Sequence, residues 1–232
     1  MQLSVIIPVY KETQGISRVL NTLLALSIPF SCEILVVDGE PEATTLKYLG
    51  SRGYADPRIR QIKSGRGRGT QMNAGAAASC GRLLFFLHAD TCPDQPGMDA
   101  LFQAWQRSDS ALFCGAFDLA IDSPKPWFRI IERTASLRSR LTRIPYGDQG
   151  IFISRSLFKE LGGFPDEPLM EDVGLMSSVK RAGVRPLFLD HKILTSARRW
   201  ETQGVIYTTL RNWILISLYN LGVPPGKLES WY

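Results

Sequence analysis

The sequence is poor in the residues that build disulfide and metal sites. It has four cysteines and two histidines in 232 residues, and the cysteines show no short metal-ligand spacing: Cys32, Cys80, Cys92 and Cys114. Cys32 and Cys114 lie in apolar or strand-like segments. We therefore expect reduced thiols that act as small hydrophobic side chains in a cytoplasmic protein.

Long hydrophobic runs are also missing. The stretch that comes nearest to a membrane span is WILISLY at 213–219, whereas a bilayer needs roughly 20 apolar residues. The N-terminus, MQLSVIIPVYKE, lacks a basic start and reaches Pro8 after a short apolar run, so it does not resemble a signal peptide. These features predict a soluble protein, or one that binds peripherally at the inner face of the membrane.

The charge is modestly positive, +5, and the basic residues do not form one block. The sequence shows neither zinc-finger spacing nor the aromatic and basic pattern of an RNA-binding strand, so we expect no nucleic-acid partner. This balance suits a phosphorylated ligand or an anionic membrane surface.

Strand and helix patterns alternate along the chain. Apolar runs predict strands over 3–8, 33–37, 58–63, 83–87, 111–121, 150–154 and 185–189. Helical spacing predicts helices over 14–26, 42–49, 70–79, 127–141, 156–161, 171–181 and 203–221. The alternation over the first ninety residues predicts an α/β fold with a mostly parallel sheet.

The sequence predicts one domain with a C-terminal extension. We expect a domain over 1–200, with a nucleotide-binding half over 1–90 and a catalytic half over 91–200, followed by an amphipathic helical extension over 201–232. Aromatic and apolar residues recur along this extension beside Arg198, Arg199, Arg211 and Lys227. The pattern is that of a core helix, a homodimer interface or a membrane-surface helix, and these remain open.

Acidic residues follow three of the predicted parallel strands. Glu12 and Asp38 come after the first two strands, and Asp90 ends the segment RLLFFLHADTCPD. The carboxyl ends of parallel strands meet at one edge of a sheet, where α/β proteins bind ligands. A carboxylate there can hold a metal, accept a hydrogen bond from a sugar hydroxyl, or cap the next helix, and these readings remain open.

Two further segments carry chemical groups. SGRGRG at 64–69 can bring backbone amides, Arg66 and Arg68 to a phosphate, or it can be a solvated loop; it is neither a dinucleotide fingerprint nor a P-loop. Glu171 and Asp172 begin a predicted helix, where the helix dipole alone favours acids. Their functional interpretation is a general base with a neighbouring carboxylate that positions another group.

The ordered set of motifs resembles the family 2 glycosyltransferases. The segments are SVIIPVYKE, EILVVDG, LHAD, GDQGIF, EPLMEDV and SARRW. GRGRGTQMNAGA and the ending RNWILISLYNLGVPPGKLESWY are similar to the bacterial subgroup called rSAM/selenodomain-associated transferase 2. The resemblance implies a GT-A fold and an inverting transferase that uses a nucleotide-diphosphate sugar, with uracil as the usual base.

The resemblance also implies residue roles. Asp172 corresponds to the catalytic base, with Glu171 beside it, and Asp90 to the last acid of the family's DxD metal motif. The residues implied to bind the nucleotide sugar are Pro8, Tyr10, Glu12, Asp38, Arg68, Asn73, Asp90, Asp148, Gln149, Arg199 and Trp200. The implied cofactor is Mn²⁺ or Mg²⁺.

Two positions depart from the family pattern. Gly39 stands where a second acid is common, and His88 occupies the first position of DxD. His88 can add a nitrogen ligand, which suits Mn²⁺ better than Mg²⁺, or it can hydrogen-bond within the turn.

Other protein classes compete with a family 2 glycosyltransferase as the interpretation of this sequence. A nucleotidyltransferase would have an N-terminal glycine-rich loop with a lysine, and an NAD-dependent oxidoreductase would have a fingerprint after the first strand; the sequence shows neither. The main alternative is a catalytically degenerate nucleotide-binding or scaffold protein on the same fold. The acceptor stays open among a lipid-linked molecule, a peptide, a carotenoid-like molecule and a small metabolite.

Overall fold

A single mixed sheet organises the chain. The computed structural model describes residues 2–108, 110–229 and 231. Within them the eight-stranded sheet has the order β3 (Ile59–Lys63), β2 (Cys32–Asp38), β1 (Leu3–Val9), β4 (Leu83–Phe86), β7 (Ile151–Ser154), β6 (Cys114–Asp122), β8 (Leu187–Ser196) and β5 (Thr91–Cys92). Strands β7 and β5 run antiparallel to their neighbours, and the other pairs are parallel.

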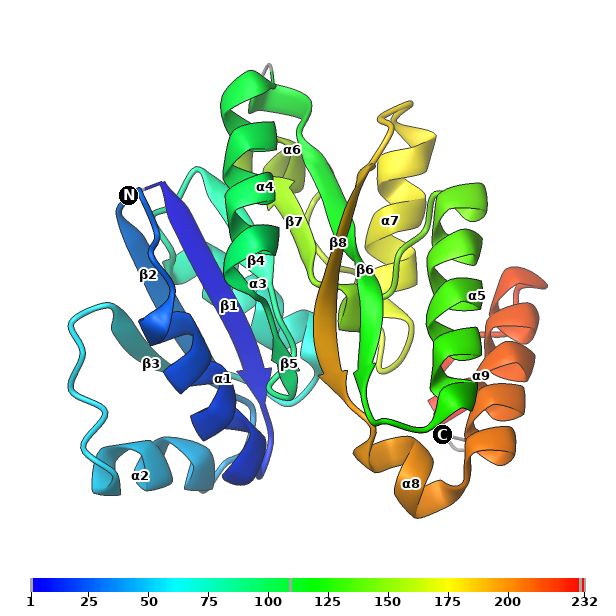
Figure 1. Ribbon diagram of the computed structural model, residues 1–232, viewed down its shortest axis with the longest axis horizontal. Coiled ribbons are helices and arrows are strands. Elements are labelled where there is room, and N and C mark those ends of the chain that lie inside the picture. The colour runs from blue at the N-terminus through cyan, green and yellow to red at the C-terminus, as the bar shows by residue number, and fades with distance from the viewer. Residues whose placement is uncertain (1, 109, 230, 232) are drawn as a thin grey trace.

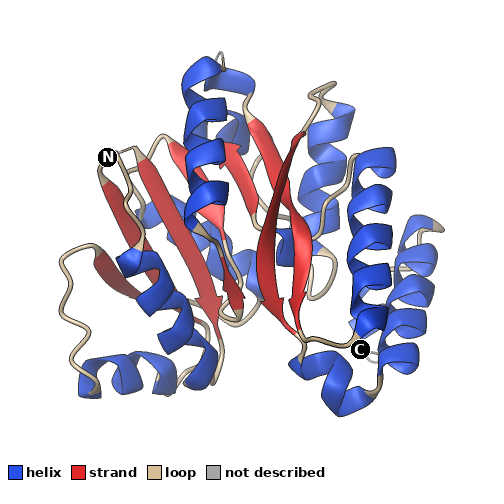
Figure 2. Ribbon diagram, in the orientation of Figure 1, coloured by secondary structure: helices blue, strands red, loops and turns tan. Residues whose placement is uncertain are grey.

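Helices cover both faces of the sheet, as Figures 1 and 2 show. Helices α1 (Gln14–Ala25), α2 (Thr44–Ser51) and α4 (Gln95–Arg107) pack against one face, where the core includes Leu3, Val5 and Ile7. Helices α3 (Arg68–Ala78), α6 (Arg155–Glu160) and α7 (Glu171–Arg181) pack against the other face, where the core includes Ile6 and Phe86. Both faces of β1 and β2 are therefore buried, which explains their continuous apolar runs.

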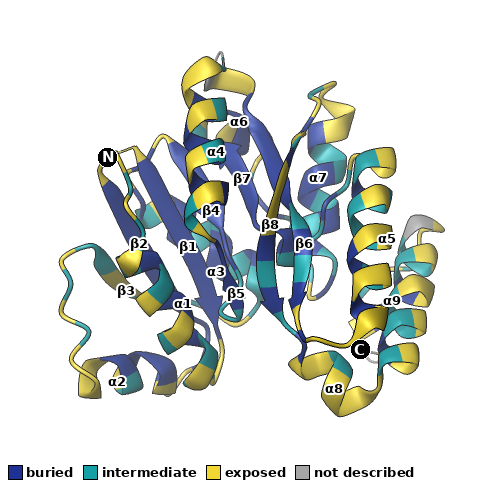
Figure 3. Cartoon of the chain, viewed as in Figure 1, coloured by how far each residue is buried: buried dark blue, intermediate teal, exposed yellow. Residues whose placement is uncertain are grey.

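The last helices lie beside the β6 end of the sheet. α5 (Pro126–Thr142) packs on β6, and the chain then returns through α8 (Arg198–Gln203), α9 (Val205–Asn220) and α10 (Pro225–Glu229). Figure 1 shows α5 and α9 next to each other at the right. In Figure 3 the strand β1 is dark blue, β8 is partly yellow and teal, and α5 and α9 both carry yellow segments, so these helices keep an exposed side.

The sheet brings distant segments to one edge. Figure 1 shows β1, β6 and β8 pointing downward, so their carboxyl ends share the lower edge with those of β2 and β4. The antiparallel β7 begins at this edge, directly after a short 3₁₀ turn, η2 (Gly147–Gln149). The amide of Ser196 donates to the carbonyl of Asp90 (3.1 Å), so the end of β8 meets the loop after β4.

Several sequence-based boundaries were wrong. No helix was predicted over α4, and β8 continues to Ser196 rather than ending at Leu189, with a bulge at Asp190 and His191. The helix expected over 203–221 is present as α9 (Val205–Asn220), and Gly204, with a φ of +90°, separates it from α8, which was not predicted. Ser230 and Tyr232 of the predicted extension lie outside the described residues. Within those residues, no helix is long and apolar enough to cross a membrane.

Candidate active site

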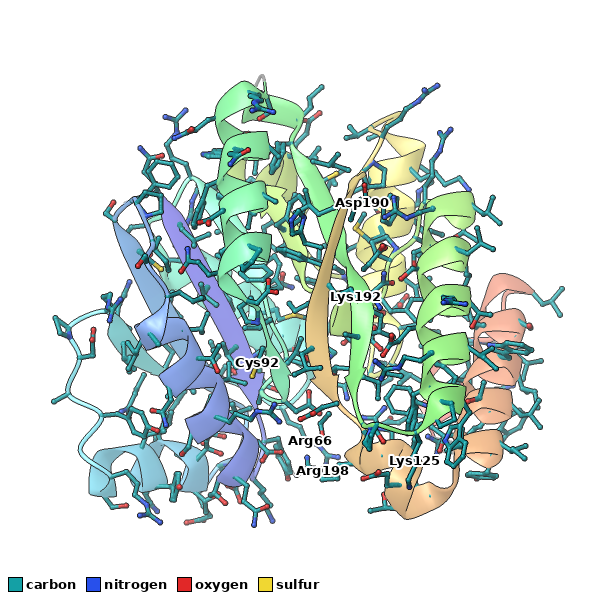
Figure 4. All side chains as sticks on the ribbon, viewed as in Figure 1. Arg66, Cys92, Lys125, Asp190, Lys192 and Arg198 are labelled. Carbon is teal, nitrogen blue, oxygen red and sulfur yellow. The ribbon has the colours of Figure 1, made fainter. Side chains whose placement is uncertain are left out.

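The first cavity, which we call the rim cavity, lies below the end of β1. It measures about 190 Å³, and its lining includes the predicted residues Pro8, Tyr10, Glu12, Arg68, Asp90 and Arg199. Tyr10 is 42% exposed, and the Arg66 guanidinium lies 5.2 Å from its ring centre. Figure 4 labels Arg66 and Arg198 at this lower edge. An exposed aromatic ring beside an arginine offers a surface on which a flat ligand can stack.

Glu12 organises one side of the rim cavity. Its Oε1 accepts a hydrogen bond from the Gly15 amide (2.9 Å), and its Oε2 accepts one from Arg198 Nη2 (2.8 Å). Burial by itself raises the pKa of Glu12, but the bonds from Arg198 and Gly15 bring it below its ordinary value. Glu12 is therefore held as a carboxylate, and the extension of β8 places its partner 186 positions later in the chain.

Asp38 and Gly39 do not line the rim cavity. Gly39 lies next to its wall, because the Gly39 amide donates to the carbonyl of Val9 (3.1 Å). Asp38 is fully buried, and its carboxylate accepts amide bonds from Glu40 (2.9 Å) and Leu46 (3.4 Å). Gln71 donates to the carbonyls of Val9 and Val37, at 2.7 Å each. A β-carbon at position 39 would lie 2.7 Å from Gln71 Cδ, so the hydrogen-bonded Gln71 side chain leaves no room for a larger residue than glycine.

The second cavity, which we call the catalytic cavity, continues from the first. It measures about 150 Å³ and contains Asp148, Glu171, Asp172 and Trp200. The two cavities share four lining residues: Arg68, His88, Asp90 and Arg199. An extended ligand can therefore pass from the rim cavity to the catalytic cavity across two arginines and one carboxylate.

Four acids and two arginines determine the charge of the catalytic cavity. Burial raises the pKa of Glu171 to about 7, and the neighbouring Asp172 adds to this, although Arg68 lies 3.8 Å from its Oε1. Burial likewise raises the pKa of Asp148 to about 6. Burial lowers the pKa of Arg199, and Arg68 lowers it further. The two arginines repel each other, so the cavity favours an anion between them.

Asp172 is held in a defined orientation. Its Oδ2 accepts a 2.6 Å hydrogen bond from the amide of Gly147 at the start of η2, and its Oδ1 accepts one from the amide of Val173 (2.7 Å). A β-carbon at position 147 would lie 2.5 Å from His88 Nε2. The imidazole therefore packs against Gly147, and burial lowers the pKa of His88 to about 3, with repulsion from Arg68 adding to the shift. His88 stays neutral here.

Besides Asp38, two predicted ligand-binding residues lie outside both cavities. Asn73 holds the loop that precedes α7, because its amide bonds to the carbonyl and the amide of Phe164, at 2.9 Å each. Gln149 is buried; its Nε2 donates to the carbonyl of Phe117 (3.0 Å), and its Oε1 accepts from Ser139 Oγ (2.5 Å). These contacts support the segments that carry Glu171 and Asp148.

The structure adds residues that the sequence reading did not select. Gln71 lines the rim cavity, and Tyr146, Thr195, Ser196 and Asn212 line the catalytic cavity. Tyr146 stacks with Arg138, whose Cζ lies 3.2 Å from the ring centre. The position of Tyr146 immediately before GDQGIF was a usable signal, whereas Asn212 comes from α9 and no local pattern distinguishes it from other polar helical residues.

The Asp90 carboxylate fits a divalent metal only in part. The described residues contain no group of three or more histidine, cysteine, aspartate or glutamate side chains placed to hold an ion. The Asp90 carboxylate accepts a long hydrogen bond from Oγ1 of its neighbour Thr91 (3.4 Å). Mg²⁺ commonly takes one or two carboxylates and completes its shell with substrate phosphates and water, so Asp90 fits such a shared site.

Comparisons with known proteins agree with the fold and the motifs. The sequence pattern of glycosyl transferase family 2 matches residues 4–165. A dolichyl-phosphate beta-glucosyltransferase from Drosophila melanogaster is 32% identical over 112 residues, which cover 44% of this chain and 34% of the fly protein. Glycosyltransferase AglE from Haloferax volcanii is 33% identical over 99 residues, which cover 41% of this chain and 33% of AglE. The chain thus spans about a third of these relatives.

A solved structure shares the architecture. The mannosyltransferase PcManGT from Pyrobaculum calidifontis, in complex with GDP-Man and Mn²⁺, superposes with a TM-score of 0.63 at 21% identity, covering 83% of this chain and 56% of that one. The expected GT-A-like fold, an α/β fold with a mostly parallel sheet flanked by helices, is confirmed. Because the family match covers more than half of the sequence, the chain belongs to glycosyl transferase family 2.

Proposed function

We propose that the protein transfers a sugar from a nucleotide-diphosphate donor to a hydroxyl acceptor with inversion at the anomeric carbon. The continuity of the two cavities carries this proposal. A diphosphate held at the four shared residues would direct the nucleoside into the rim cavity and the sugar toward Asp172. Mannosyltransferase PcManGT was solved with GDP-Man, and Staphylococcus aureus TarS 1-349 with UDP-GlcNAc at a TM-score of 0.62, 18% identity and 84% coverage of this chain.

The residues of the rim cavity would bind the nucleoside. Tyr10 offers its exposed ring to the base, and Asp38 supports the loop below by accepting backbone amides. Pro8 and Glu12 complete the wall, and the Glu12–Arg198 ion pair closes it on the β8 side. We propose uridine as the nucleoside, following the family resemblance.

Arg68 and Arg199 would hold the diphosphate. Both line the two cavities, and an anion placed between them would relieve their mutual repulsion. Asp90 would hold Mn²⁺ or Mg²⁺ together with the diphosphate oxygens. A bound divalent ion supplies positive charge that stabilises the departing nucleoside diphosphate. His88 packs against Gly147, so we assign it to the support of η2 rather than to the metal shell.

Asp172 would act as the general base. The Gly147 amide fixes one carboxylate oxygen, which orients the group toward the cavity it lines. The carboxylate would remove the proton of the acceptor hydroxyl as that oxygen attacks the anomeric carbon from the side opposite the leaving group. Glu171, Asp148 and Trp200 line the same space and would position the sugar and acceptor.

A membrane-near location suits this protein. The residues of α9 that keep large exposed apolar side chains are Ile206, Tyr207, Leu210, Trp213 and Ile214. We propose that this face rests on a membrane surface, where an apolar acceptor would be available. We also place the chain in the rSAM/selenodomain-associated transferase 2 subgroup, on the motifs in GRGRGTQMNAGA and in the C-terminal ending.

Calorimetric titration with UDP and with GDP, each with Mn²⁺ and with EDTA, tests the proposal. We expect UDP to bind with Mn²⁺ and to bind markedly more weakly with EDTA. Equal binding with EDTA would show that arginines alone carry the diphosphate. Failure of both nucleotides to bind would favour the alternative, a degenerate scaffold on the same fold, for which His88 in place of an acid is the best support.

A further inference from the structure

A third cavity, which we call the helix groove, opens between α5 and α9. It measures about 180 Å³. Its apolar walls include Leu119 from β6, Ile131 and Ala135 from α5, and Trp213 from α9. In Figure 1 these two helices run next to each other at the right of the molecule. Most of the groove lining thus comes from α5 and α9, which contribute no residue to the rim cavity.

The helix groove joins the catalytic cavity. Four residues line both: Tyr146, Asp148, Trp200 and Asn212. In the proposed function the donor reaches the catalytic cavity from the rim cavity, past Arg68 and Arg199, and the rim cavity shares no lining residue with the groove. A molecule lying in the groove would therefore reach Asp172 from the side that the donor leaves free, which is the approach that an acceptor needs.

The charges at this junction disfavour an anionic head group. Asp148 lies at the junction and Asp172 lines the catalytic cavity, whereas Arg68 and Arg199 line the part of that cavity that is shared with the rim cavity. A phosphate entering from the groove would therefore face two carboxylates first. Among the described residues that line the groove, one is basic, and this residue is Arg138. It is already engaged, since it stacks on Tyr146 at 3.2 Å and donates to Ser139 Oγ (3.0 Å) and Gln149 Oε1 (3.5 Å).

We infer that the helix groove binds the acceptor, and that this acceptor is an uncharged alcohol with an apolar body rather than a lipid phosphate. The apolar body lies between α5 and α9, and the hydroxyl group passes Asp148 to reach Asp172. This inference rests on the proposed transferase function. It differs from what the name of the dolichyl-phosphate relative would suggest, because the junction presents acids where a phosphate would enter.

Two probes test the inference: 1-octanol and octyl phosphate. They share the same eight-carbon chain and differ only in the terminal group, which is a hydroxyl in one and a phosphate in the other. Each is titrated calorimetrically into protein that holds UDP and Mn²⁺. We expect octanol to bind at least about tenfold more tightly than octyl phosphate, the discrimination expected from an unfavourable charge placement. Tighter binding of octyl phosphate would overturn the assignment of an uncharged head. Binding of neither probe would overturn the groove as an apolar site.

Matched variants on α5 locate the binding. Thr134 lines the groove, and Thr142 is exposed on the same helix without lining it. Thr134→Phe should weaken octanol binding about tenfold or more, because the ring displaces roughly two methylene groups of the tail. Thr142→Phe should bind octanol as the wild type does. Equal octanol binding by both variants would place the probe elsewhere and overturn the inference.

Two further readouts separate this inference from the proposed function. Asp148→Asn should narrow the preference for octanol over octyl phosphate, and an unchanged preference would overturn the role of Asp148. UDP affinity should be the same in wild type, Thr134→Phe and Thr142→Phe, which also shows that the variants are folded. Loss of UDP binding in the wild type would instead contradict the donor site.

Discussion

The amide of Gly147 donates a 2.6 Å hydrogen bond to Asp172 Oδ2. The two residues are 25 positions apart, and the bond links the turn before β7 to the first turn of α7. Its geometry depends on glycine, since a β-carbon at position 147 would lie 2.5 Å from His88 Nε2 and 3.5 Å from the same Asp172 oxygen. This contact fixes the base relative to the GDQGIF segment.

Gly147→Ala should therefore impair catalysis more than binding. The added methyl displaces His88 or the turn, and a catalytic group displaced by 1 Å can lose about 100-fold in rate. We expect kcat to fall at least about tenfold with little change in UDP affinity. Gly50→Ala is the control, because nothing lies within 4 Å of a β-carbon there. Equal effects of the two substitutions would contradict the prediction.

Asp172→Asn should abolish transfer while leaving nucleotide binding nearly intact. The amide oxygen can still accept from Gly147, but the side chain no longer takes a proton at neutral pH. General-base catalysis contributes about 10²- to 10⁴-fold, so the rate should fall by this factor. Steady-state kinetics and UDP titration provide the two measurements. Loss of UDP binding equal to the loss of rate would refute the role as base.

Asp90→Asn should weaken Mn²⁺-dependent UDP binding without affecting the fold. The substitution removes the carboxylate charge that the proposed metal site needs, and Mn²⁺ titration at fixed UDP measures the change. Asp99→Asn, at an exposed position on α4, is the control. His88→Gln should leave the Mn²⁺ dependence unchanged. If His88→Gln weakens Mn²⁺ binding as strongly as Asp90→Asn does, His88 is a second metal ligand and our assignment of His88 to packing is wrong.

Glu171 should make stability depend on pH. Its pKa is about 7 in the folded protein against an ordinary 4.5, so the folded chain keeps a proton that the unfolded chain releases. The stabilisation by this proton is fully present below about pH 4.5. The free energy of unfolding therefore falls as the pH rises from about 4.5 to about 7.

The measurement is the melting temperature of wild type and Glu171→Gln from about pH 5 to about pH 8. The variant should lose less stability over this range than the wild type. Glu160→Gln, at an exposed position on α6, should follow the wild type. Parallel profiles for wild type and Glu171→Gln would show that Glu171 does not titrate in this window.

The exposed face of α9 should contact vesicles. Ile206→Ser and Ile214→Ser each remove an exposed apolar side chain, 77% and 56% accessible respectively. The double variant should sediment less with phosphatidylglycerol vesicles than the wild type does. Leu112→Ser is the control, because Leu112 is 56% accessible and lies in the 3₁₀ turn before β6 rather than on α9. Concentration-dependent light scattering without vesicle binding would show instead that this face joins two copies of the chain.

Local pattern was sufficient for much of the architecture. The continuous apolar runs of β1, β2 and β4 predict buried strands, because helices cover both faces of the sheet there. The alternation of strands and helices then places the carboxyl ends of these parallel strands at one edge. The bounds of α7 were predicted as Glu171–Arg181, since acids at its start and basic residues at its end mark both termini.

Local pattern failed where long-range contacts decide the structure. α4 is an exception, because its Asp94 cap and the helical spacing of Met98, Leu101, Phe102 and Trp105 are local signals that the prediction overlooked. The polar residues Asp190 and His191 made β8 look finished, yet pairing with β6 and β5 extends the strand. Cross-strand partners define such segments, and a window of sequence does not contain them.

The sequence by itself determined the fold class, the family resemblance and half of the residues that line the rim and catalytic cavities, because each depends on residue types at local spacing. Tertiary structure decided the relations among them: Glu12 meets Arg198, Gly147 orients Asp172, and Gln71 occupies the space below Gly39. It also created the helix groove, whose walls come from α5 and α9. These relations depend on contacts between residues far apart in sequence, which only the packed sheet brings to one edge.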